Sequence, residues 1–140
     1  MKSRAWVGVT LIKIACVYLM AALLVGMLMA IRHDFSLVSV HTHIALLGWT
    51  TMAIAGGVYV LFPRCANTGL AGAHFWLHNI GLPIMMAGLA ARVLSGDQRA
   101  EPLVAFGSVL VILGLLAFTT SVARNARIPA QEEASVDMPR

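Results

Sequence analysis

Four apolar stretches separated by short polar segments constrain this chain more than any other feature of its sequence. Each has about 20 residues or more, enough for a helix to cross the roughly 30 Å of hydrocarbon in a bilayer. They cover residues 5–31, 41–62, 71–94 and 102–123. The segments between them are short, as expected for antiparallel neighbours in a bundle. The sequence therefore predicts an all-α, integral-membrane four-helix bundle over residues 1–123 and a disordered cytoplasmic tail over residues 124–140.

Composition and charge support a membrane protein. The chain is 59% hydrophobic and 11% charged, which is too apolar for a soluble domain. Basic residues gather on one side of the predicted bundle: Lys2, Arg4, Arg64, Arg124, Arg127 and Arg140. By the positive-inside rule, both termini are expected in the cytoplasm of a bacterial cell, with the bundle in its inner membrane. The basic residues do not alternate with aromatic ones, so nucleic-acid binding is not indicated.

The first stretch follows Met1-Lys2-Ser3-Arg4, a charge pattern that secretory signals share. Its apolar run is about twice as long as the apolar core of a signal, so we expect an uncleaved first helix. Lys13 lies within this stretch. Its long side chain can extend to the headgroups, and a contact deeper in the bundle is the alternative.

Two histidines, His41 and His43, stand at the start of the second stretch. A titratable group at membrane depth costs several kcal/mol unless something pairs with it. Two residues apart on a helix, the rings diverge by about 200° and must serve two different neighbours. Neutral imidazole is an axial ligand of haem iron, and a porphyrin suits a bundle lined by small and aromatic side chains. The alternative is a hydrated interfacial pair with no ligand.

Three further residues belong to this predicted haem site. Gly48 and Trp49 follow the two histidines and are expected to form a shelf beside them. Arg92, at the outer end of the third stretch, is expected to pair with a haem propionate, alone or with Arg32 or Arg99. An ordinary interfacial arginine is the alternative role for Arg92.

His74 and His78 form a second pair near the start of the third stretch. Four residues apart, they share one helix face with Cβ atoms about 6 Å from each other. They are candidates for a shared copper or other metal ion, and bonds to backbone carbonyls or to each other are the alternative. Since the third stretch starts at the opposite face of the membrane from His41, we expect about 20 Å or more between the pairs and hence two sites.

Three segments resemble a known family. They are His41-Thr-His43-Ile-Ala-Leu-Leu-Gly-Trp49, Tyr59-Val-Leu-Phe-Pro63 and His74-Phe-Trp-Leu-His78-Asn-Ile-Gly-Leu-Pro83. The chain resembles short four-helix proteins related to subunit I of the heme-copper oxidases, nearest the cbb-type cytochrome c oxidase and nitric oxide reductase branch. In that family one helix carries a His-x-His pair that ligates two haems, which His41 and His43 match.

The resemblance implies an assembly larger than one chain. Subunit I has twelve helices in three arcs of four, and a homotrimer of this chain would supply twelve; a dimer with a haem between subunits is also open. If the chain is an enzyme, the resemblance implies a cytochrome c oxidase-like oxidoreductase. The copper-binding histidine cluster of the full subunit is not found here, so oxygen reduction by one chain is not expected.

The sequence leaves three possible functions to be tested. The first is a membrane-embedded b-type haem protein for electron transfer or for binding a diatomic gas such as O2 or NO, with a respiratory-chain electron donor. The second is a haem or copper carrier, or a partner or assembly subunit of a respiratory oxidase, without catalysis of its own. The third is a purely structural bundle.

Overall fold

The computed structural model describes residues 5–127, and this part of the chain is helical with no strand. The elements are α1 (Ala5–Arg32), α2 (Val38–His43), the π-helix η1 (Ile44–Thr51), α3 (Met52–Leu61), α4 (Pro63–Ala66), α5 (Gly69–Ser95), the 3-10 turn η2 (Gln98–Ala100) and α6 (Glu101–Asn125). They form four helices long and apolar enough to cross a membrane, namely Trp6–Arg32, Val38–Leu61, Gly69–Ser95 and Gln98–Asn125. The predicted all-α protein with four spans is confirmed. Most of the predicted tail, residues 128–140, lies outside the described residues.

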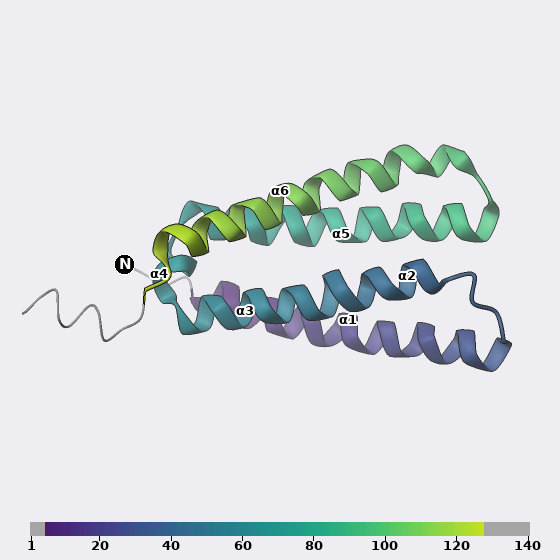
Figure 1. Ribbon diagram of the computed structural model, residues 1–140, viewed down its shortest axis with the longest axis horizontal. Coiled ribbons are helices and arrows are strands. Elements are labelled where there is room, and N and C mark those ends of the chain that lie inside the picture. Colours follow the sequence, from purple (N-terminus) through teal and green to yellow (C-terminus); the bar gives the residue numbers. More distant parts are fainter. Residues whose placement is uncertain (1–4, 128–140) are drawn as a thin grey trace, which may run out of the picture.

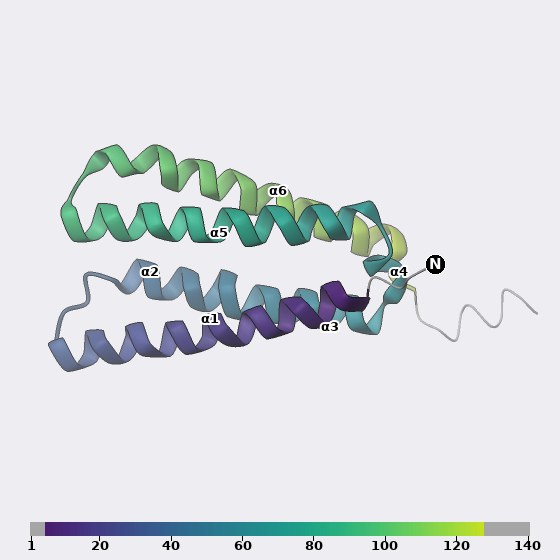
Figure 2. The same ribbon diagram turned by 180° about the vertical axis from the view of Figure 1, so that it is seen from behind.

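Two long helical hairpins lie side by side (Figures 1 and 2). The first pairs α1 with the continuous α2–η1–α3 segment, and the second pairs α5 with α6. The short helix α4 joins them at the end of the molecule where α1 begins and α6 ends (Figure 1). The loops after α1 and α5 both lie at the opposite end, so successive spans alternate in direction (Figure 1).

Glycines let the backbones within each hairpin approach closely. A Cβ atom on Gly56 of α3 would lie 2.7 Å from the carbonyl oxygen of Gly8 in α1. A Cβ atom on Gly107 of α6 would collide with the backbone nitrogen of Met85 and would lie 2.7 Å from the carbonyl oxygen of Gly81 in α5. Small residues at helix contacts are the usual basis of association in lipid, where no hydrophobic effect drives it. Each hairpin is therefore held mainly by tight van der Waals packing.

The corner around α4 is fixed by side-chain hydrogen bonds. Pro63 stands in the first turn of α4, where its missing N–H costs nothing. The hydroxyl groups of Thr68 and Ser121 both donate to the carbonyl oxygen of Cys65, at 3.0 Å each. Thr68 also caps α5, because its Oγ1 accepts from the backbone N–H of Ala71 at 3.2 Å. These bonds attach the corner to α6.

The second span contains an eight-residue π-helix, η1, that the apolar pattern did not predict. Thr50 and Thr51 donate from their hydroxyl groups to the carbonyl oxygens five residues earlier, those of Ala45 and Leu46, at 3.1 and 2.8 Å. Such bonds suit the wider turn of a π-helix. The π-helix begins at the residue after His43, so it separates the two predicted haem ligands from the rest of the span.

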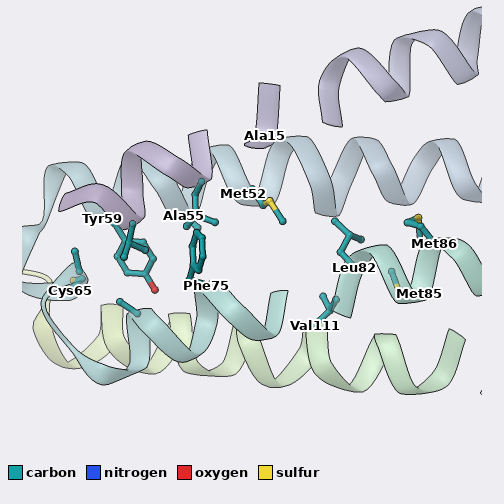
Figure 3. Packing of buried hydrophobic residues seen from close by; sticks show 14 of the residues in the cluster. Ala15, Met52, Ala55, Tyr59, Cys65, Phe75, Leu82, Met85, Met86 and Val111 are labelled. Carbon is teal, nitrogen blue, oxygen red and sulfur yellow. The ribbon is translucent and has the colours of Figure 1, made fainter. Parts of the chain in front are cut away.

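The buried core runs along the contact between the hairpins (Figure 3). Tyr59, Ala55 and Phe75 occupy its half near α4, and Leu82 and Met86 lie towards the opposite end. The outward faces of α1 and α6 are covered by exposed aliphatic side chains, such as Val17 and Ile112. A chain that leaves so much apolar surface outward is suited to lipid.

Candidate functional site

His41 turns inward, towards α1 of its own chain. Its Nδ1 lies 2.9 Å from the carbonyl oxygen of Ala22, and the ring is half-buried. A Cβ atom on Gly26 would lie 3.0 Å from Cε1 of the ring, so the glycine provides the space in which the imidazole lies. His41 therefore packs within the first hairpin instead of pointing away from it.

His43 turns outward from the same short helix. Its side chain is exposed, and its Nδ1 lies 2.7 Å from the carbonyl oxygen of Ser39, one turn earlier. The divergence of the two rings, which their spacing predicted, is confirmed. Of the two rings, that of His43 is the exposed one.

The two hydrogen bonds fix the tautomer of both rings. A carbonyl oxygen can only accept, so Nδ1 of His41 and Nδ1 of His43 must each carry the proton. In the neutral ring the lone pair is then on Nε2. An Nδ1–H held by a backbone carbonyl is the usual arrangement of a histidine that ligates a metal through Nε2. Both rings therefore keep their lone pair on Nε2, and the ring of His43 is the more exposed of the two.

Gly48 and Trp49 do not form an open shelf. Gly48 is buried, and a Cβ atom on it would lie 2.5 Å from Cγ of Tyr18 in α1. Trp49 is partly buried and packs against the core. The ring of Tyr18 thus occupies the space where the sequence suggested a flat ligand, because α1 approaches the π-helix closely at this glycine.

Arg92 pairs with a carboxylate of the same hairpin. Its Nη1 lies 3.5 Å from Oε2 of Glu101, with both side chains about half exposed. An exposed ion pair of this kind contributes little to stability and leaves the guanidinium able to exchange partners. Arg92 lies at the same end of the molecule as His41 and His43, the end of the two loops, as the sequence predicted.

A hollow at this end is too small for a porphyrin. Its volume is about 110 Å³, and it is lined mainly by the end of α1 and the following loop, including Met29, Arg32 and Leu37, with Leu94 of α5. Sites for cofactors and drug-sized ligands usually enclose about 300–1,000 Å³. His43 is not among the residues that line it, so this hollow does not hold a haem beside that ring.

His74 and His78 are fully buried, one turn apart on α5, as their spacing predicted. Their ring centroids are 5.5 Å apart and the rings meet edge to face. Nδ1 of His74 lies 3.2 Å from the hydroxyl oxygen of Tyr59, and Nε2 of His78 lies 3.1 Å from the carbonyl oxygen of Leu47 in the π-helix. Phe118 of α6 packs on the ring of His74 at 5.2 Å between centroids. The second, third and fourth spans thus contribute to this cluster.

Two nitrogens in this cluster have no hydrogen-bond partner among residues 5–127. They are Nε2 of His74 and Nδ1 of His78. A buried polar atom left unpaired costs about 1–3 kcal/mol, so native proteins rarely keep two together. The sequence did not single out Tyr59 and Leu47 as their neighbours, since a carbonyl carries no sequence signal and tyrosine is common at membrane interfaces.

The two histidine pairs lie closer together than the separation of about 20 Å or more that the sequence predicted, and this part of the prediction is wrong. Nε2 of His78 lies 3.1 Å from the carbonyl oxygen of Leu47, which is only four residues after His43, or about 6 Å at the usual helical rise. The pairs are nevertheless distinct, because His43 is exposed and His78 is buried. Within residues 5–127, no group of three or more His, Cys, Asp or Glu side chains is placed to hold a metal ion. A shared ion at His74 and His78 would have two protein ligands.

Comparisons with known proteins supply no relative for this chain: no family model, curated protein or solved structure matches it. The class is defined by the fold alone, as an all-helical protein whose four spans are suited to a membrane.

Proposed function

We propose that the chain is a membrane-embedded b-type haem protein that acts as a homo-oligomer, related to subunit I of the heme-copper oxidases. Nε2 of His43 ligates the iron, and Arg92 pairs with a propionate. The protein lies in a bacterial inner membrane with both termini in the cytoplasm. It transfers electrons or binds a diatomic gas such as O2 or NO.

One observation carries the proposal: the Nδ1–H of His43 is held by the carbonyl oxygen of Ser39. This bond leaves the lone pair on Nε2 of an outward-facing ring inside a membrane span. A polar atom facing lipid costs free energy unless a partner satisfies it, and iron would do so.

The exposure of His43 requires a second surface over the haem. Leu46, one turn further along the same face, is also exposed, and so are the polar residues Ser39 and Thr50 on either side. A symmetric oligomer would bring such faces together, with a trimer favoured by the resemblance and a dimer as the other closed form. Two histidines on one iron favour electron transfer, and a single histidine leaves a position open for a gas.

His41 is the less direct candidate in this proposal. Its Nδ1 is likewise held by a carbonyl, but its ring lies against Gly26 within its own hairpin. An iron at its Nε2 would have to enter beside α1. We therefore assign the first ligand to His43.

Absorption spectroscopy tests the proposal. Protein expressed in haem-replete cells and purified in mild detergent is expected to show a Soret band and a dithionite-reduced b-type spectrum. His43→Ala is expected to lose this spectrum with unchanged helical content, because the substitution is on an exposed face. Addition of carbon monoxide to the reduced protein reports whether one axial position is open.

His33→Ala is the matched control, because it removes an exposed imidazole at the same end of the molecule. It is expected to keep the full spectrum. A colourless wild-type preparation, or a His43→Ala variant with unchanged haem content, would contradict the proposal.

A further inference from the structure

A second site lies in the buried cluster of Tyr59, His74 and His78, and it does not depend on haem. The three side chains are fully buried and come from two spans, with a carbonyl of the π-helix at one end. The hydrogen bonds that surround the cluster determine what its two unpartnered nitrogens can bind.

The tautomer of His78 follows from its carbonyl partner. The oxygen of Leu47 can only accept, so Nε2 of His78 carries the proton. Nδ1 of the neutral ring is then a bare acceptor, and it is one of the two unpartnered atoms.

The tautomer of His74 follows from Tyr59. The only hydrogen-bond partner of the phenol among the described residues is Nδ1 of His74. If the hydroxyl donates, Nδ1 of His74 accepts the hydrogen bond. Nε2 of the neutral ring then carries the proton. If it accepts instead, the phenol proton is left without an acceptor in a buried site, which is the costlier arrangement. Nε2 of His74 is therefore an unpartnered donor.

An unpartnered donor and an unpartnered acceptor thus occur on adjacent rings whose centroids are 5.5 Å apart. We propose that these two atoms bind one small neutral molecule that accepts from His74 and donates to His78, with water as the smallest member of this class. Such a bridge satisfies both nitrogens, as buried waters do for polar groups in protein interiors. A cation is less well suited, because one of the two nitrogens carries a proton and no carboxylate or thiol completes a set of three ligands within residues 5–127.

The bridge completes a chain of hydrogen bonds through the bundle. It runs from the hydroxyl of Tyr59 through His74, the bound molecule and His78 to the carbonyl of Leu47. Tyr59 and Leu47 are twelve residues apart in one span. The polar chain therefore connects the half of the span near α4 with the π-helix, and it is lined by apolar side chains such as Phe118.

Solid-state NMR of protein labelled with 15N and 13C in histidine, reconstituted in lipid bilayers with water as the probe, tests this site. His74 and His78 are expected in the Nε2–H tautomer, whereas the bond of His41 to Ala22 predicts Nδ1–H for that ring. A cross-peak from the Nε2 proton of His74 to bound water is expected, and His78→Phe should remove it. The signals are assigned from their loss in single-histidine variants.

Tyr59→Phe provides a second measurement that keeps the aromatic ring. Without the phenol proton, His74 is expected to change from a single tautomer to a mixture of both. Tyr18→Phe is the matched control, since that tyrosine packs on Gly48 and should leave His74 unchanged.

Three results would overturn the proposal. One is a direct coupling between the nitrogens of the two rings, and another is a His74 proton with contacts only to carbon-bound protons. The third is one equivalent of copper(I) bound by the wild type and lost in His78→Phe, which would place a metal ion there instead.

Discussion

Cys65 has an environment that makes its thiol unreactive. The side chain is fully buried in the corner between α3 and α5, where its carbonyl accepts bonds from Thr68 and Ser121. Burial raises the pKa of the Cys65 thiol above its ordinary value of 9.0. Since the thiolate is the reactive form, both access and ionisation are suppressed.

We therefore predict that Cys65 in a Cys16→Ser background resists maleimide at pH 7 in mild detergent. Labelling should be more than about tenfold slower than for a free thiol and complete after denaturation in SDS. Mass spectrometry of the intact protein measures the labelled fraction. Ser36→Cys, in the exposed loop after α1 of a chain with both native cysteines replaced, is the fast-reacting control. Rapid labelling of native Cys65 would show that this corner opens.

Asp34 gives a residue-scale prediction about pH. The backbone N–H of Ser36 donates to Oδ1 of Asp34 at 2.9 Å, and this bond is the main cause of the lowered pKa of Asp34. A carboxyl whose folded pKa is depressed contributes stability above its unfolded value, here 3.8, and loses it as the pH falls through the folded value. A titration of the Asp34 carboxyl followed by 13C NMR should give a midpoint below 3.8. Ser36→Pro, which removes the N–H donor, should move the midpoint upward, and an unchanged midpoint would contradict this account.

Individual side chains were predictable from sequence where spacing alone decides the geometry. The divergence of His41 and His43 and the shared face of His74 and His78 follow from helical periodicity. The hydrogen-bond and packing partners of these residues did not follow from helical periodicity. Ala22, Ser39 and Leu47 act through backbone carbonyls, and Tyr18 occupies the space beside Gly48 only because α1 approaches the π-helix there.

At the scale of elements, the end of α1 carries a strained residue. His33 has a φ of 50°, in the left-handed region, directly after the last helical residue. The N–H of His33 donates to Ala30 and that of Asp34 donates to Met29, which is the Schellman arrangement that glycine prefers. At the end of α5 the corresponding residue is Gly96, with a φ of 66°.

We predict that His33→Gly stabilises the protein by roughly 0.5–1 kcal/mol, because glycine adopts this conformation without steric cost. Gly96→Ala should destabilise it by about 1 kcal/mol for the same reason. Unfolding in mixed micelles, followed by far-UV circular dichroism, measures both changes. A destabilised His33→Gly variant would indicate that the imidazole makes a contact that outweighs the backbone strain.

The elements differ in how far sequence could define them. The positions of α1, α5 and α6 follow from apolar runs and from end signals such as Thr68 and Pro102. The π-helix could not be predicted from such signals, because a π-helix has the same apolar composition as an α-helix. Thr50 and Thr51 are the one local signal, and only their carbonyl partners reveal it.

At the scale of the whole molecule, the number of spans could be predicted from the sequence because the bilayer thickness sets the length of a spanning helix. The pairing of spans into two hairpins depends on which small residues face each other, as at Gly8 and Gly56. Neither the exposed His43 nor the helix face around it reveals a partner within one chain. The haem and the oligomer therefore stay predictions, with the spectrum of His43→Ala as their test.

The alternating fold makes a prediction about sidedness. The loops after α1 and α5 lie at one end of the molecule, and the end of α6 lies at the other (Figure 1). In a chain with Cys16 and Cys65 replaced by alanine, Ser36→Cys and Gln98→Cys should react in intact cells with a membrane-impermeant maleimide. Arg127→Cys should react only after the membrane is permeabilised, because the positive-inside rule predicts a cytoplasmic location for the end of the molecule with the excess of Arg and Lys. Protection of positions 36 and 98 with labelling at 127 would reverse the orientation, and a difference between 36 and 98 would contradict the two-hairpin fold itself.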